Sequence, residues 1–271
     1  WRNIMLSGWC LAADNTKMSK SKCNVGEPVL LIERFGADII RFWASTSKLG
    51  ADTAFSEDAL VLGKKFVNKL WNAAKFASQH FDKITEIEQP LNQLITDGRI
   101  CHDVDLWLLA KLNNTIIKTT KELAEFEYCN ARVAIEDFFW KDFCDNYLEI
   151  SKVRAYNEHG GNPAEQASAI YTLYLSLNII LRLFAPFTPY VTEEIYQAIY
   201  STDSVHTKGN WPEQITDVGD ANLISQGREL TYILDMVRKA KAEKNLSIKA
   251  AIKLLRIKST NFNLDSPAIL A

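Results

Sequence analysis

The segment from Ile170 to Phe184 is apolar on nearly every side when it is drawn as a helix. Asn162, Pro163 and Glu165 precede it and form the pattern of a helix start, with a capping amide, a proline at the first position and an acid in the first turn. A helix without a polar face has to be enclosed by other helices or by lipid. Because we find no run of eighteen apolar residues, the sequence predicts the centre of a helical bundle and no membrane partner.

Other segments supply the remaining helices of a mainly α fold. Their apolar residues recur three and four positions apart, which places them on one face of a helix. A hydroxyl cap at Ser56, with acids directly after it, begins a long helix that is expected to end near His80, and residues 82–102 resemble a connector. The predicted apolar stripes are Val29, Leu30, Ile32 and Phe35, ended by Gly36; Ile39, Ile40, Phe42 and Trp43 after Asp38; Leu62, Phe66, Leu70, Ala73 and Ala77; Leu109, Leu112, Ile116 and Leu123, with Asp103 or Asp105 as the cap; Phe139, Phe143, Tyr147 and Ile150; and Leu230, Ile233, Leu234 and Val237.

Two segments predict β structure near the ends of the chain. Residues 1–13 are mostly apolar and indicate a buried strand or strand pair that leads into a polar loop. Residues 252–258 partly alternate apolar with basic side chains, as in a half-exposed strand, and are expected to start a small C-terminal α/β element. Since the first residue is Trp1 and not methionine, we expect the chain to begin inside a larger protein.

The composition narrows the class of protein. The chain has 271 residues and a net charge of −2, so it does not resemble a protein that coats nucleic acid, and any such contact needs a local basic face. Its 5 cysteines are scattered, without a C-x-x-C pair or a histidine at ligand spacing, so we predict neither a disulfide framework nor a bound metal. Reduced cysteines indicate a cytoplasmic protein. The histidines, interpreted as surface residues, are His80, His102, His159 and His206.

A polar loop at Lys17-Met18-Ser19-Lys20-Ser21 carries the predicted chemistry. Two ammonium groups three positions apart, with hydroxyl donors beside them, suit an exposed loop that closes over a polyphosphate. Two lysines among serines usually form no more than a solvated loop. Here the complete pentapeptide, with Asn24 and Val25 behind it, is similar to the second signature of class I aminoacyl-tRNA synthetases.

Further motifs resemble the valyl-tRNA synthetase family over nearly the whole chain. The segment 185–195 is shared with the leucine and isoleucine enzymes of the class, whereas the segment 66–73 favours valine. In chain order the matching motifs are residues 50–56 (GADTAFS), 66–73 (FVNKLWNA), 140–151 (WKDFCDNYLEIS), 185–195 (APFTPYVTEEI) and 206–212 (HTKGNWP).

This resemblance implies an ATP-dependent ligase that attaches valine to its tRNA. Residues 1–47 are then the end of an α/β catalytic domain with the ATP loop, 48–215 a helical anticodon-binding bundle, and 216–271 a C-terminal helix with the start of a small α/β element. ATP enters as its Mg²⁺ complex, and a domain upstream of Trp1 holds valine and the rest of the ATP site. We therefore expect the isolated chain to be monomeric, to bind the valine-accepting tRNA and to lack activity.

Within the loop, the resemblance assigns ATP binding to Lys17, Met18, Ser19, Lys20 and Ser21. In the family pattern the second lysine, Lys20, is tied most directly to ATP and pyrophosphate, and Lys17 assists it; these two are the predicted catalytic residues. The family usually has glycine where this chain has Cys23. If the backbone needs a positive φ there, a non-glycine residue costs about 1–2 kcal/mol.

Two alternative interpretations stay open on the sequence. An isoleucyl- or leucyl-type enzyme of the same class shares the loop and the 185–195 segment. A helical RNA-binding or scaffold module without an enzyme is the other, and it requires the lysine loop to have no role. Valine-dependent exchange between ATP and pyrophosphate separates the first alternative from the valine enzyme.

The helix that begins near Ser56 provides the predicted tRNA contact. Between Ala59 and Phe81 it has four lysines and no acid. Lysines hold phosphates, asparagines read base edges, and Phe76 could stack an unpaired anticodon base. The alternative is that Phe76 belongs to the core and that the lysines only solvate the helix. The predicted contact residues are Lys64, Lys65, Asn68, Lys69, Asn72, Lys75 and Phe76.

Overall fold

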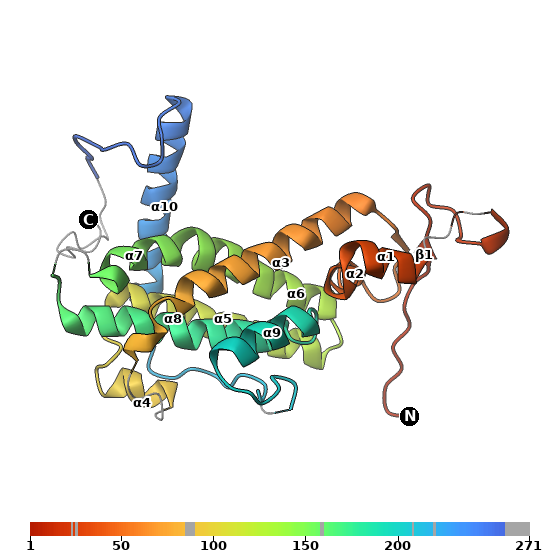
Figure 1. The fold of residues 1–271 in the computed structure, drawn as a ribbon, viewed down its shortest axis with the longest axis horizontal. Helices are drawn as coiled ribbons and strands as arrows, with labels where there is room; N and C mark the ends of the chain where they lie inside the picture. The colour runs from red at the N-terminus through yellow and green to blue at the C-terminus, as the bar shows by residue number, and fades with distance from the viewer. Residues whose placement is uncertain are drawn as a thin grey trace.

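Helices account for 64% of the residues described in the computed structural model, which confirms the prediction of a mainly α fold. The structure describes residues 1–22, 24, 27–84, 90–157, 160–207, 209–218 and 221–257. In chain order the elements are β1 (Cys10–Leu11), η1 (Lys20–Lys22), α1 (Pro28–Phe35), α2 (Ala37–Ala44), β2 (Thr53–Ala54), α3 (Glu57–Ser78), η2 (Phe81–Lys83), α4 (Leu91–Thr96), α5 (Asp103–Ala124), α6 (Tyr128–Asp137), η3 (Phe138–Tyr147), α7 (Leu148–Tyr156), α8 (Pro163–Phe184), α9 (Pro189–Ile199) and α10 (Ala221–Glu243). Figure 1 shows β1, α1 and α2 at one end of the bundle and α10 projecting from its side.

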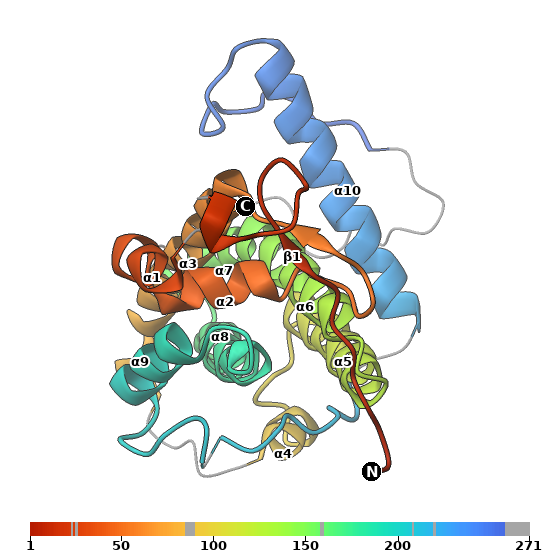
Figure 2. The same ribbon diagram turned by 90° about the vertical axis from the view of Figure 1, so that its right-hand side faces the viewer.

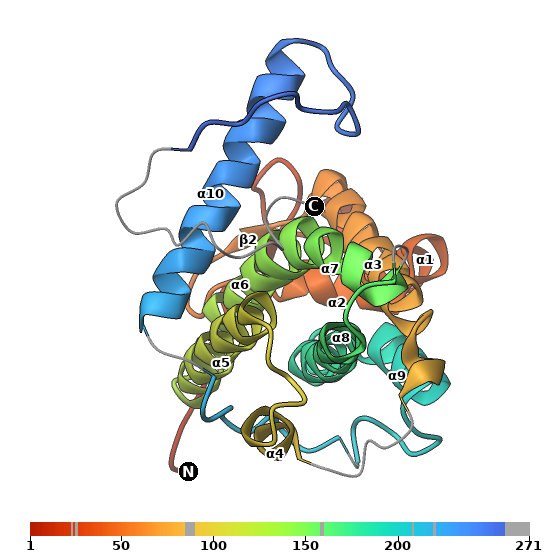
Figure 3. The same ribbon diagram turned by 90° about the vertical axis from the view of Figure 1, so that its left-hand side faces the viewer.

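The apolar helix α8 lies in the middle of the bundle, as its sequence predicts. It contacts α3, α5, α6, α7 and α9, which lie around it when the bundle is viewed along its long axis (Figures 2 and 3). By length and composition α8 could cross a membrane, but 72% of its most apolar stretch is buried inside the protein. Neighbouring helices therefore provide the apolar surroundings that a helix of this composition needs.

Aromatic rings join four elements at the centre of the bundle. Phe66 of α3 stacks on Phe42 of α2, with ring centroids 4.5 Å apart, and lies 4.6 Å from Phe184 of α8. Phe139 of η3, a π-helix, meets Phe66 edge-on at 5.7 Å. All four rings are buried, so the predicted aromatic stripe containing Phe139 belongs to the core and not to a nucleic-acid surface.

Two long helices begin at their predicted caps. At the start of α3 the Ser56 hydroxyl accepts a hydrogen bond from the Ala59 N–H at 3.3 Å. Before α8, Asn162 Oδ1 accepts one from the Ala164 N–H at 3.0 Å. Both caps act within a few residues of the chain, and they satisfy N–H groups that have no partner inside the helix.

Helix α5 begins at a different residue, and the prediction of Asp103 or Asp105 as its cap is wrong. His102 occupies that position, and its Nδ1 accepts a hydrogen bond from the Val104 N–H at 3.2 Å. Asp105 is directed into the core, because Arg154 of α7 forms an ion pair with it there at 2.6 Å.

Other predictions are wrong because the packing of the bundle determines which side chains are buried. Leu62 is 61% exposed, because the buried side of α3 centres on Phe66 and Leu70 and turns Leu62 toward solvent. His80 is buried at 3% exposure, against the prediction of a surface histidine, since it packs edge-on against Tyr156 at 4.5 Å. The predicted connector 82–102 contains the short helix α4. His159 lies outside the described residues.

The ends of the chain contain less β structure than predicted. Residues 1–13 contribute the two-residue strand β1, and the side chains of Trp1 and Trp9 are exposed. Residues 252–257 are in no strand, and most of their side chains are exposed. A strand needs a neighbour to satisfy its backbone groups. Among the described residues of these two end segments, β1 has such a neighbour in β2.

Strands β1 and β2 pair in parallel, with Cys10 opposite Thr53 and Leu11 opposite Ala54. Just before β1, Gly8 lies so close to Ala51 that a Cβ atom at position 8 would come within 2.0 Å of the Ala51 carbonyl oxygen. The close approach therefore requires glycine at this position. Because β2 leads directly into α3, the strand pair ties the loop after β1 to the first turn of that helix.

Candidate functional site

The loop that carries the lysine pair is anchored at its base by both strands. The Thr53 N–H donates a hydrogen bond to the Trp9 carbonyl at 2.9 Å, and the Trp9 N–H donates to Asp52 Oδ1 at 2.7 Å. An isolated antiparallel bridge between Leu11 and Lys17 then closes the loop on itself. The base of the loop is thus held by the residues that lead into α3.

Asn24 holds the loop in shape from within. Its Oδ1 accepts a hydrogen bond from the Ser19 N–H at 2.8 Å, and its Nδ2 donates to Thr16 Oγ1 at 3.0 Å and to the Lys17 carbonyl at 3.3 Å. The hydroxyls of Ser19 and Ser21 lie 2.8 Å apart. The sequence pattern included Asn24 only as part of the motif, so its positioning role was missed. The available signal was an amide side chain soon after the pentapeptide.

The structure places both predicted catalytic lysines on this loop and describes one of the two side chains. Lys17 is exposed, and its ammonium lies 4.6 Å from the centre of the Trp9 ring, which is a cation–π contact. Met18 is half-buried. Lys20 begins the 3-10 turn η1, but its side chain lies outside the described part of the structure, as does Cys23.

A single acid stands in the turn before these lysines. The Thr16 hydroxyl and N–H donate to Asp14 Oδ1 at 2.7 and 3.0 Å, and these hydrogen bonds lower the pKa of the Asp14 carboxyl. The carboxylate therefore stays ionised at neutral pH and holds the turn.

The outward side of α3 carries most of the residues predicted to bind tRNA. Its lysines Lys64, Lys65 and Lys75 have no acidic partner among the described residues. Lys69 and Phe76 are half-buried and lie at one edge of this side. The exposed members of the predicted set are Lys64, Lys65, Asn68, Asn72 and Lys75.

The edge with Lys69 and Phe76 faces η3 and α7. Lys69 Nζ lies 3.7 Å from Asp145 Oδ1 and 5.4 Å from the centre of the Trp140 ring, so an acid partly neutralises this predicted phosphate contact. Phe76 packs on the core, and Lys152 Nζ lies 5.3 Å from its ring centre. Part of the Phe76 ring remains exposed, so base stacking by Phe76 stays a prediction.

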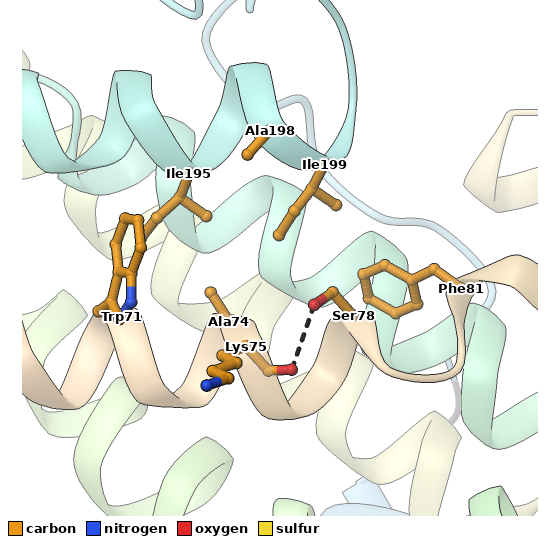
Figure 4. Close-up of a pocket in the computed structure, with 8 residues that line it drawn as sticks. All are labelled: Trp71, Ala74, Lys75, Ser78, Phe81, Ile195, Ala198 and Ile199. Atoms are coloured by element: carbon orange, nitrogen blue, oxygen red, sulfur yellow. Dashed lines mark hydrogen bonds between the residues drawn. The ribbon is translucent and has the colours of Figure 1, made fainter.

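The opposite edge borders a groove of about 540 Å³ between α3 and α9. Figure 4 shows Trp71 at one end of the groove and Phe81 toward the other, with Lys75 between them. Trp71 is 45% exposed, and sequence reasoning missed it. The available signal was an aromatic residue four positions before a lysine, in the part of the helix after Ala59 that has no acid. The groove is lined by Trp71, Ala74, Lys75, Ser78, Phe81, Ile195, Ala198 and Ile199.

A buried ion pair fixes how the helices around α8 are arranged. Asp105 accepts hydrogen bonds from Arg154 Nη2 at 2.6 Å and Nη1 at 2.8 Å, and from the hydroxyls of Tyr147 at 2.7 Å and Ser168 at 2.6 Å. Burial disfavours the charged Arg154, but the hydrogen bonds and charge of Asp105 outweigh it and raise the pKa of Arg154. Burial and then the neighbouring Asp105 charge raise the pKa of Tyr147. The cluster ties α5, η3, α7 and α8 together.

Two sequence profiles match this chain along most of its length. The family described as "Anticodon-binding domain of tRNA ligase" matches residues 105–256, which is more than half of the chain. The family described as "tRNA synthetases class I (I, L, M and V)" matches residues 1–56, the part that carries the lysine loop. The chain therefore belongs to the family of anticodon-binding domains of tRNA ligases.

The curated relatives narrow the resemblance further. A "Valine--tRNA ligase" from Rickettsia felis is 53% identical over 268 residues, which covers 98% of this chain and 31% of the relative. One from Rickettsia typhi is 54% identical over 260 residues and covers 95% of this chain and 31% of the relative. The predicted resemblance to valyl-tRNA synthetases is thereby confirmed. The chain spans about a third of the length of these relatives.

A solved structure shares the fold. It is the LeuRS in the ternary complex of Agrobacterium radiobacter K84 agnB2 LeuRS with tRNA and LeuAMS, with a TM-score of 0.58. It is 19% identical and covers 80% of this chain and 24% of the LeuRS chain, so this likeness concerns the fold alone. The division of the chain into domains with boundaries at residues 47 and 215 stays a prediction.

Proposed function

We propose that this chain is part of a valine–tRNA ligase and supplies both the loop that acts on ATP and the bundle that binds the anticodon arm of tRNA. The observation that carries the proposal is that one chain joins a class I synthetase profile over residues 1–56 to an anticodon-binding profile over residues 105–256. Valine is favoured over isoleucine or leucine because the curated relatives described above are valine--tRNA ligases.

The loop chemistry follows from the reaction. Activation of an amino acid displaces pyrophosphate from the α-phosphate of ATP, and the attacking carboxylate is already ionised. The protein therefore has to position the reactants and neutralise the charge that develops on the leaving oxygens. Lys17 suits this task because its described partner is the face of Trp9, which holds a cation more weakly than a phosphate does. An interaction gained as Lys17 and Lys20 close over the phosphates raises the rate of the step.

Other components of the reaction enter as substrates. ATP is expected as its Mg²⁺ complex; the described residues contain no group of three His, Cys, Asp or Glu side chains that could hold a metal ion. Valine binds in the part of the ligase that lies outside this chain. We further propose a monomer in the cytoplasm without a membrane partner, and size-exclusion chromatography coupled to light scattering checks the monomeric state.

The tRNA would lie on the outward side of α3. Lys64, Lys65 and Lys75 are exposed there without described acidic partners, so their charge is available to phosphates. Asn68 and Asn72 are exposed between them and offer amide donors and acceptors to bases or backbone. Because the chain has a net charge of −2, holding a polyanion requires a local basic surface of this kind.

A salt titration of tRNA binding tests this function. In the unaltered chain, the logarithm of the binding constant should fall linearly with the logarithm of the salt concentration, because bound lysines release counterions from phosphates. Replacing Lys65 and Lys69 by alanine should weaken binding and flatten the slope by up to about two units. Lys69 is expected to contribute the smaller part, since Asp145 lies beside it.

The matched control replaces Lys118 and Lys121, two exposed lysines of α5, by alanine. This pair removes the same charge from a different helix and should leave the slope within about half a unit of the unaltered chain. An equal loss in both double variants, or no loss in either, would place the tRNA on a different surface. Absence of tRNA binding by the unaltered chain would overturn the function itself.

A further inference from the structure

We propose that the groove between α3 and α9 binds one unpaired nucleotide of the RNA, with its base against Trp71 and its phosphate at Lys75. The inference rests on the proposed RNA-binding function, and it extends the predicted contact, which includes Lys75, by a base-binding groove at Trp71. It leaves the predicted role of Phe76, on the opposite edge of α3, as a separate question.

Small side chains make the groove hollow. Ala74 on α3 and Ala198 on α9 face each other where larger residues would close the gap between the two helices (Figure 4). The groove of about 540 Å³ lies in the size range of small-molecule sites, and Ile195 and Ile199 give it an apolar wall. A flat, largely apolar ring is a natural occupant of such a space.

Trp71 offers the stacking surface. Its side chain is 45% exposed and its indole borders the groove, whereas Trp107 in the core is 2% exposed. Figure 4 shows the indole rising from α3 toward α9 at one end of the groove. Every nucleobase has a π face, so an indole in this position stacks a base without requiring one particular sequence.

Charge and hydrogen-bonding capacity favour a nucleotide over a purely apolar side chain. Lys75 lines the same groove, is exposed, and has no acidic partner among the residues that the structure describes. The Ser78 hydroxyl donates to the Lys75 carbonyl at 3.2 Å, so its oxygen remains free to accept a hydrogen bond from a base N–H. Lys64 and Lys65 extend the positive surface along α3, which leads an RNA backbone toward the groove.

The test compares two RNA probes of equal length on this chain: a stem-loop with the sequence of a valine tRNA anticodon arm, and a fully paired duplex. Trp71→Ala should weaken binding of the stem-loop about tenfold and leave binding of the duplex unchanged, because only the stem-loop has bases free to stack. Trp71→Phe, which keeps an aromatic face, should retain most of the affinity. Lys75→Ala should weaken both probes and lower the salt slope by about one unit.

Trp1→Ala serves as the matched control, because Trp1 is fully exposed and lies outside the groove. Circular dichroism and thermal unfolding show whether each variant keeps its fold. If Trp71→Ala does not, Trp71→Leu, which keeps a large apolar side chain but no aromatic face, tests the site in its place and should lose the same affinity for the stem-loop. If Trp71→Ala, or Trp71→Leu in its place, binds the stem-loop as tightly as Trp1→Ala does, the groove is not a base site and a protein segment becomes the better occupant. That result leaves the proposed function intact as long as the α3 lysine variants still alter the salt slope.

Discussion

The carboxylate of Asp38 on α2 accepts a hydrogen bond from the backbone N–H of Val191 at 2.6 Å, in the first turn of α9. The Tyr190 N–H donates to the same carboxylate at 3.1 Å. Two N–H groups without helical partners are thus satisfied by a residue far away in sequence, and the negative charge lies at the positive end of the α9 dipole. Arg41 of α2 donates to the Pro186 carbonyl at 2.8 Å. These hydrogen bonds therefore hold α2, which follows the lysine loop, against α9, the helix that forms one wall of the groove between α3 and α9.

Asp38→Ala is expected to lower the free energy of unfolding by about 2 kcal/mol, because it removes a buried charged acceptor from two N–H groups. Asp38→Asn keeps one acceptor oxygen and should lose about half as much. Urea denaturation followed by circular dichroism measures both changes. The control is Asp203→Ala in an exposed loop, expected to stay within about 0.5 kcal/mol of the unaltered chain. Equal stabilities for Asp38→Ala and this control would contradict the capping role.

Breaking the pair of Asp105 and Arg154 should cost more. Asp105→Ala leaves the Arg154 guanidinium buried without its partner and is expected to destabilise the chain by about 3–5 kcal/mol. Replacing both residues together, as in Asp105→Leu with Arg154→Met, removes the unpaired charge and should cost less than Asp105→Ala alone. Thermal unfolding of the three proteins checks this order. A double variant that is less stable than Asp105→Ala would show that the pair itself, and not the unpaired charge, carries the energy.

The cap at His102 makes stability depend on pH. Its Nδ1 accepts a hydrogen bond from the Val104 N–H, so this cap requires the neutral imidazole ring of His102. Burial, and then the Arg154 charge, lower the pKa of His102 below its ordinary value of 6.5, although Asp105, Glu165 and Asp103 oppose this. As the pH falls below about 6.5, His102 therefore takes up a proton more readily in the unfolded chain than in the folded one. The free energy of unfolding decreases over this range until the pH reaches the pKa of His102 in the folded chain.

His102→Asn keeps a capping side chain and removes the titration, so its stability should change less between pH 7 and pH 5 than that of the unaltered chain. The measurement is the urea midpoint at each pH. His80, whose pKa is also lowered by burial, contributes in the same direction in both proteins and cancels in the comparison. Identical pH dependence in both would contradict the role of His102.

How much the sequence predicts depends on how far apart the interacting residues are in the chain. Ser56 and Asn162 were predicted as caps because each bonds to an N–H within three residues. The same local rule predicts Asp103 or Asp105 as the cap of α5, and for Asp105 it fails because its partner Arg154 lies 49 positions away. Trp71 was missed for a related reason: a groove exists only once α3 packs beside α9, and no local pattern indicates that contact.

The loop shows the same division. The pentapeptide from Lys17 to Ser21 was recognisable because the motif is continuous in the sequence. The placement of Trp9 under the Lys17 ammonium was not predicted, since it depends on the turn that brings the strand before the loop back against it.

The lysines of this loop are expected to affect catalysis in the full-length gene product. Lys20→Ala is expected to slow valine-dependent exchange of pyrophosphate into ATP by at least about a hundredfold, as the loss of one charge-stabilising donor does elsewhere. Lys17→Ala should slow it less, because Lys17 assists Lys20 in the family pattern. Exchange kinetics with labelled pyrophosphate measure both. Lys48→Ala, at an exposed position outside the loop, provides the control and should remain within about twofold of the unaltered enzyme. An unchanged rate in Lys20→Ala would remove the loop from the chemistry, while the RNA-binding side of α3 would still be judged by its own salt titration.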